Sequence, residues 1–122
     1  MGRRIAILAQ DLIWQDRLAR SVTAAGGEPV TATTAAAFDD ALAGTDLAVI
    51  DLTARSYDPL AAIERAVAAG ARVLAVGQHD DHALRKQALA SGADRVLAYR
   101  KLFEDGPATI EAWLGRVAEV GR

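Results

Sequence analysis

The stretch Asp46-Leu47-Ala48-Val49-Ile50-Asp51-Leu52 decides the fold of this 122-residue chain. Residues 47–50 are all apolar and do not alternate with polar ones, which is typical of a strand covered on both faces, as in a parallel sheet. Asp51 places a carboxylate at the C-terminal end of this run. A carboxylate at the end of a buried strand has few purely structural uses, so Asp51 is the first candidate functional residue.

Short apolar runs of the same kind recur along the chain, and each precedes a segment with helical spacing. We predict five strands, over residues 5–9, 28–33, 46–52, 72–76 and 95–99. The first helical segment has Trp14, Leu18 and Val22 on one face. Helix N-caps are predicted at Thr34, at Asp58 and at Asp80 or Asp81, and Gly106-Pro107 is predicted to open the last helix.

Strict alternation of strands and helices implies a parallel sheet with right-handed crossovers and helices on both faces. Five strand–helix units fit a three-layer α/β/α, doubly wound, flavodoxin-like sheet with strand order 2-1-3-4-5. We expect residues 1–122 to form a single domain without a linker. In this fold ligands and chemistry gather at the C-terminal ends of the strands, where the strand order reverses.

Charge and cysteine content exclude several classes of function. The chain has 14 basic and 16 acidic residues, net −2, and no Cys. Disulfides and thiolate metal sites are therefore excluded, and a role in binding nucleic acid is disfavoured. No segment reads as an export signal or a membrane span, so we expect a cytoplasmic protein without membrane partners.

The turn after the first predicted strand excludes common nucleotide sites. Gln10-Asp11-Leu12-Ile13-Trp14 contains no glycine, whereas a dinucleotide loop or a P-loop needs glycine for close approach of the backbone to phosphate. His79 and His82 flank two aspartates, and we interpret this cluster as helix-capping carboxylates beside exposed histidines.

Asp11 and Asp51 follow strands that neighbour each other in the predicted sheet. Two carboxylates at adjacent strand ends repel each other unless a cation or a proton relieves them. Mg²⁺ bound by Asp11 and Asp51 is one solution, and Asp51 is then a candidate nucleophile for a phosphoryl group. The alternative is that both carboxylates serve as turn or helix-cap residues.

The chain resembles the receiver domains of bacterial two-component response regulators, the CheY-like superfamily, over essentially all its length. Residues 46–52 look like the strand motif that ends at the phosphorylated aspartate, and residues 92–97 and 25–30 are similar to two further segments. The resemblance implies a phosphorelay in which a histidine kinase phosphorylates Asp51. It places Thr53 where family members tune dephosphorylation.

The departures from the family pattern are as informative as the matches. The acidic pair that binds Mg²⁺ is reduced to Gln10 and Asp11, or to Ala9 and Gln10 if the register shifts by one residue, which leaves no acid there. Gly77 stands where receivers carry a hydroxyl. Tyr99 replaces the lysine that pairs with the phosphoryl oxygens, and Lys101 lies two residues further on. The residues expected around a phosphoryl group are therefore Thr53, Gly77, Tyr99 and Lys101, an incomplete set typical of a pseudo-receiver.

The leading hypothesis is an atypical, degenerate receiver that acts as a protein–protein interaction module in signalling and not as an enzyme. Its expected partner is a signalling protein or a histidine kinase. The fourth helix, fifth strand and fifth helix share a charged face, which we interpret as solvated. The alternative is that this face forms a homodimer interface. Its charged residues are Arg85, Lys86, Arg95, Arg100, Glu111 and Arg116.

Two other functions stay open. One is a Mg²⁺-dependent phosphoacceptor receiver that is phosphorylated on Asp51. The other is a domain that binds a small ligand at the strand ends, near Trp14, Tyr99 and the gap left by Gly77.

Overall fold

A computed structural model describes residues 3–78 and 80–120, with side chains to residue 116, and His79 lies outside the described residues. The strands are β1 (Arg4–Leu8), β2 (Glu28–Ala32), β3 (Leu47–Asp51), β4 (Arg72–Gly77) and β5 (Arg95–Ala98). The helices are α1 (Leu12–Ala24), α2 (Ala35–Leu42), α3 (Pro59–Ala68), α4 (His82–Ala90) and α5 (Tyr99–Val120).

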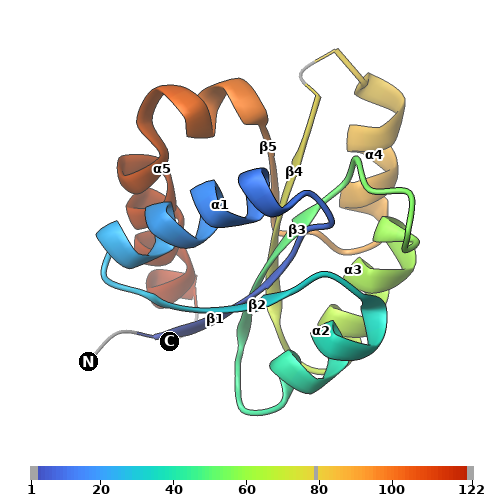
Figure 1. Ribbon diagram of the computed structural model, residues 1–122, viewed down its shortest axis with the longest axis horizontal. Helices are drawn as coiled ribbons and strands as arrows, with labels where there is room; N and C mark the ends of the chain where they lie inside the picture. Colours follow the sequence, from blue (N-terminus) through green and yellow to red (C-terminus); the bar gives the residue numbers. More distant parts are fainter. Residues whose placement is uncertain (1–2, 79, 121–122) are drawn as a thin grey trace.

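The strands form one parallel sheet in the order β2-β1-β3-β4-β5, which confirms the predicted topology. Figure 1 shows the sheet nearly edge-on, with α1 and α5 on one side and α2, α3 and α4 on the other. The arrangement is the three-layer α/β/α sandwich expected from the sequence. No helix in the described part of the chain is long and apolar enough to span a membrane.

The central strand β3 contributes to two separate cores, and this explains its continuous apolar run. Ala48 and Ile50 pack in the core beneath α2, α3 and α4. Leu47 and Val49 pack in the opposite core, beneath α1 and α5. Successive side chains of a strand point to opposite faces, so a strand between two helical layers needs apolar residues at every position.

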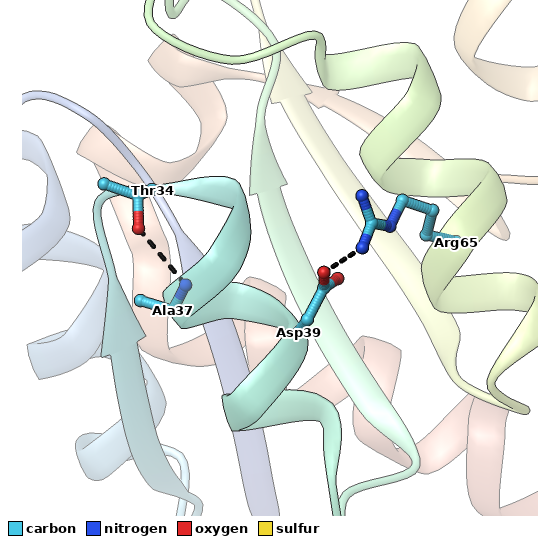
Figure 2. A network of polar contacts seen from close by, with 4 residues as sticks. All are labelled: Thr34, Ala37, Asp39 and Arg65. Carbon is cyan, nitrogen blue, oxygen red and sulfur yellow. Dashed lines mark hydrogen bonds and ion pairs between the residues drawn. The ribbon is translucent and has the colours of Figure 1, made fainter.

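Side-chain caps begin the helices as the sequence predicted. Thr34 Oγ1 accepts a hydrogen bond of 3.1 Å from Ala37 N at the start of α2, while Asp58 and Asp81 cap α3 and α4 in the same way. Each cap satisfies backbone N–H groups that have no partner inside the helix. Figure 2 shows the Thr34 cap together with the ion pair of Asp39 and Arg65, which joins α2 to α3.

The last helix begins earlier than predicted. We expected it to open at Gly106-Pro107, but α5 starts at Tyr99 and is interrupted at Asp105, whose φ of −156° and ψ of 64° are not helical. Pro107 lacks an N–H and crowds the turn before it, which accounts for the break. The sequence pattern therefore revealed the second segment of α5 and missed the short helical segment before the break.

The buried face of α3 is formed by Ala62, Ile63 and Ala66. The spacing of Leu60, Ile63 and Val67 in the sequence predicts that these three residues share an apolar stripe. Val67 is nevertheless 40% exposed, and it lies beside Gly92, where an added Cβ would be 2.9 Å from Val67 Cγ2.

Trp113 is the largest fully buried side chain among the described residues. Its Nε1 donates a hydrogen bond of 3.2 Å to Asp94 Oδ2. We expect Trp113→Ala to lower the free energy of unfolding by about 3–5 kcal/mol, because it leaves a cavity and an unpaired carboxylate oxygen.

The matched control is Phe103→Ala, on the same helix, where the ring is 66% exposed. Its expected cost is about 1 kcal/mol or less, chiefly from its contact with the Arg17 guanidinium. Urea unfolding of both variants measures the difference. Equal losses of stability would contradict the assignment of Trp113 to the core.

Candidate functional site

Asp51 is the buried charged residue of the described chain, with 2% of its surface exposed. It is the last residue of β3, at the edge of the sheet where β1 and β3 neighbour each other. This edge is the ligand-binding end of a doubly wound sheet. The position agrees with the sequence prediction and makes Asp51 the centre of the candidate site.

Three donors converge on one oxygen of the Asp51 carboxylate. Thr53 donates to Asp51 Oδ1 through its backbone N–H at 2.9 Å and its hydroxyl at 2.8 Å. The Tyr99 hydroxyl donates to the same oxygen. Thr53 Oγ1 and the Tyr99 hydroxyl lie 2.6 Å apart, so either hydroxyl can donate its one hydrogen to the other in place of Asp51, and the three side chains form one network.

Burial sets the electrostatics of this carboxyl. Desolvation raises the pKa of Asp51 above its ordinary value of 3.8, the two hydrogen bonds from Thr53 lower it, and the charge of Asp11 raises it further. The net direction is upward because desolvation is the largest effect. Asp51 is therefore easier to protonate in the folded protein than in the unfolded chain.

Tyr57 links the C-terminal ends of β1 and β3 by hydrogen bonds. Its hydroxyl lies 2.7 Å from the carbonyl oxygen of Asp51 and 3.2 Å from that of Leu8, and bonds to both. Burial, followed by the charge of Asp51, raises the pKa of Tyr57. Sequence reasoning missed this residue, although an aromatic side chain in a loop next to the candidate Asp51 was an available signal.

Gln10 and Asp11, which were predicted at the position of the acidic pair, hold backbone groups in place. Asp11 Oδ1 caps α1, accepting bonds of 2.9 Å from Ile13 N and 3.0 Å from Trp14 N. Gln10 Oε1 accepts bonds of 2.8 Å from Arg55 N and 3.1 Å from Ser56 N in the loop after β3. The capping role, one of the two alternatives for Asp11, is thus observed.

The donor set is a poor fit to a resident metal ion. Across residues 3–78 and 80–120, no group of three or more His, Cys, Asp or Glu side chains is arranged to hold one. Asp11 and Asp51 are the two carboxylates on the candidate site, and each already accepts hydrogen bonds on Oδ1. A metal ion here would therefore have at most two protein carboxylates as ligands.

A hollow of about 310 Å³ opens beside the Asp51 carboxylate. It is lined by Asp11, Ile13, Trp14, Asp51, Thr53 and Tyr99. The rings of Trp14 and Tyr99 pack edge to face, with centroids 4.3 Å apart, and so fix one wall. The structure thus brings together four of the predicted site residues: Asp11, Asp51, Thr53 and Tyr99.

Two predicted residues stand apart from this hollow. Gly77 ends β4, where an added Cβ would lie 3.3 Å from Leu52 Cδ1, so the Leu52 side chain would have to shift slightly to admit a larger residue. Lys101 is exposed and lines a separate hollow with Arg95. Two residues along a helix amount to about 200° of rotation, so Lys101 points away from the side on which Tyr99 meets Asp51.

Comparison with known proteins identifies the fold. No protein-family model and no curated protein matches the chain. Among solved structures, the beryllofluoride-activated DrrB receiver domain (Thermotoga maritima) is 16% identical with a TM-score of 0.80, covering 98% of this chain and 99% of the other. A CheY-like receiver domain protein from Methanospirillum hungatei JF-1 is 20% identical with a TM-score of 0.77, covering 98% of each chain.

The chain has the response-regulator receiver fold. A putative pilus assembly-related protein from Burkholderia pseudomallei is also similar, at 25% identity and a TM-score of 0.76, with 96% of this chain and 90% of the other covered. These likenesses span nearly the whole chain and confirm the receiver resemblance predicted from residues 46–52.

The raised pKa predicts how Asp51 affects stability. The folded protein binds more protons than the unfolded chain at pH values between 3.8 and the raised pKa. Stability is therefore lost as the pH rises through this window. We expect Asp51→Asn, which keeps an acceptor for Thr53 and Tyr99, to be more stable than the wild type at neutral pH and to lose this advantage below pH 3.8.

Chemical denaturation as a function of pH measures this effect. Asp81→Asn at the exposed N-cap of α4 is the matched control for removing a carboxylate charge. A constant difference between Asp51→Asn and wild type at all pH values would show that the buried carboxyl does not titrate as inferred.

Proposed function

We propose that this chain is an atypical receiver that serves as a protein–protein interaction module in signalling, with a phosphoacceptor site that has lost its usual chemistry. The observation that supports this most directly is the hydrogen bond from the Tyr99 hydroxyl to Asp51 Oδ1. A neutral hydroxyl occupies the place where the receiver resemblance requires an ammonium group. A histidine kinase or another signalling protein is the expected class of partner.

The charge balance around Asp51 argues against a stable phosphoryl group. A phosphoryl group adds roughly −1.5 to −2 charges at neutral pH. Among the described residues that line the hollow at Asp51 or the one adjoining it, Arg55 is the one cation, and its side chain is exposed. Asp11 contributes a further negative charge on the same side.

The conformational response of the protein to phosphorylation of Asp51 would also be weak. A charge-assisted hydrogen bond to a phosphoryl oxygen contributes roughly 1.5–3 kcal/mol. A ligand shifts an equilibrium between two states only through contacts that differ between them. With Gly77 and Tyr99 at the positions of the hydroxyl and the ammonium, most of that difference is absent.

The hollow beside Asp51 favours a second candidate function, the binding of a small ligand. Its volume of about 310 Å³ lies at the lower end of the range for small-molecule sites. Apolar side chains of Ile13 and Trp14 form part of its lining, together with polar groups of Asp51 and Thr53. Ligand binding at this hollow is compatible with the interaction role proposed above.

Amide NMR with Mg²⁺ and beryllofluoride, which mimics a phosphoryl group, tests the main proposal. We expect the wild type to show no more shift change around Asp11, Asp51 and Gly77 than Asp51→Ala shows. Concentrated changes at these positions that disappear in Asp51→Ala would overturn the proposal and favour the Mg²⁺-dependent phosphoacceptor.

Restoring the missing groups is the complementary prediction. The double variant Gly77→Ser with Tyr99→Lys supplies a hydroxyl and an ammonium, and the added Cβ requires only a small shift of the Leu52 side chain, 3.3 Å away. We expect this variant to show Asp51-dependent shift changes with Mg²⁺ and beryllofluoride.

Tyr99→Phe with native Gly77 is the control, because it removes the hydroxyl and adds no cation. If the double variant is folded and still silent, the loss of these two groups is not the reason for inactivity.

A further inference from the structure

One oxygen of the Asp51 carboxylate has no hydrogen-bond donor within the protein. Thr53 and Tyr99 donate to Oδ1, whereas no group in the described residues 3–78 and 80–120 donates to Oδ2. Asp51 is only 2% exposed, and it lines the hollow of about 310 Å³ described above. A buried carboxylate oxygen without a donor is costly, so Oδ2 is available to accept a hydrogen bond from a bound ligand.

Oδ2 remains accessible from the hollow. In the part of the chain whose side chains are described, Trp14 Nε1 is the side-chain nitrogen or oxygen that is both fully buried and without a hydrogen-bond partner. Asp51 Oδ2 also lacks a partner, so it would belong with Trp14 Nε1 if the protein enclosed it completely. It therefore opens onto the two adjoining hollows that Asp51 lines.

The charges that line the hollow beside Asp51 are negative. Asp11 and Asp51 supply them, and none of the other lining residues is a cation. Arg55 lines the adjoining hollow, but no ion pair within 4.0 Å joins it to either carboxylate among the side chains described. We therefore expect the donor to Oδ2 to be a cation, because a positive charge relieves the repulsion between the two carboxylates.

The remaining walls favour an organic cation over a metal ion. The rings of Trp14 and Tyr99 pack edge to face, and Ile13 lines the same hollow with its side chain 74% exposed. Aromatic faces attract cations, and apolar side chains bury the carbon atoms of a ligand. Mg²⁺ instead prefers an octahedron of oxygen ligands, which apolar walls do not supply.

We propose that this hollow binds a small organic cation, a primary ammonium group on an apolar body, with the ammonium donating to Asp51 Oδ2. The apolar body lies against Ile13 and the two aromatic rings. The inference rests on the second candidate function proposed above, ligand binding at this hollow, and it names the chemistry of the ligand. A quaternary ammonium fits less well, because it has no N–H to donate to Oδ2.

An amide NMR titration of the full chain with 2-phenylethylammonium tests this inference. Three matched probes each change one property: 2-phenylethanol is neutral, trimethyl(2-phenylethyl)ammonium has no N–H, and 3-phenylpropionate is negative. We expect 2-phenylethylammonium to bind at least tenfold more tightly than each of the other three, because it alone makes a charge-assisted hydrogen bond to a carboxylate. The shift changes should concentrate at Ile13, Trp14, Thr53 and Tyr99.

Three substitutions of aspartate by asparagine separate local recognition from general attraction. Asp51→Asn keeps the shape of the side chain and should weaken ammonium binding at least tenfold. Asp11→Asn keeps the cap of α1, since Asn caps as well as Asp, and should weaken binding about two- to fivefold because Asp11 is exposed. Asp58→Asn alters the cap of α3, which lines neither hollow at Asp51, and should leave binding unchanged.

Three results would overturn the inference. Equal binding of 2-phenylethanol would show that the charge is not recognised, and ligand binding at the hollow would still stand. Tighter binding of Mg²⁺ alone at the same residues would identify a metal site. Absence of binding by all four probes would overturn the second candidate function as well. The atypical receiver role is tested separately by the beryllofluoride experiment, so the proposals fail independently.

Discussion

Burial of β3 between two helical layers is the constraint on which the rest of the structure depends. Because each side chain from Leu47 to Ile50 enters one of two cores, the strand occupies the middle of the sheet. Its parallel neighbours, β1 and β4, must then end beside it, at the same edge. Asp51 is consequently held at 2% exposure at the point where the strand order reverses.

A carboxylate buried in this way needs hydrogen-bond donors, and the loops at this end of the sheet supply them. Thr53 and Tyr99 supply donors to Oδ1, and Tyr57 fastens the backbone carbonyl of the same residue. The hydrogen bonds from Thr53 favour the ionised carboxylate and lower the pKa of Asp51, but desolvation has the larger effect. The raised pKa of Asp51 therefore follows from burial, to which the charge of Asp11 adds.

The fold and the position of Asp51 could be predicted from sequence because they depend on local periodicity and on general rules of strand connection. The contacts of Tyr99 and Gln10 could not, since they join residues 48 and 45 positions apart and depend on loop geometry. The start of α5 was missed for a related reason. Pro107 strongly predicts the start of a helix, so the short helical segment that begins earlier, at Tyr99, was not predicted.

That short segment has consequences for both faces of the molecule. If residues 99–101 formed a flexible loop, Lys101 could reach back toward Asp51 and replace the missing ammonium. Because they are helical, the two-residue offset turns Lys101 by about 200° relative to Tyr99. The same turn of helix therefore gives Asp51 a neutral partner in Tyr99 and places Lys101 beside Arg95, away from Asp51. The helical start of α5 at Tyr99 thus decides which of the two side chains meets the buried carboxylate.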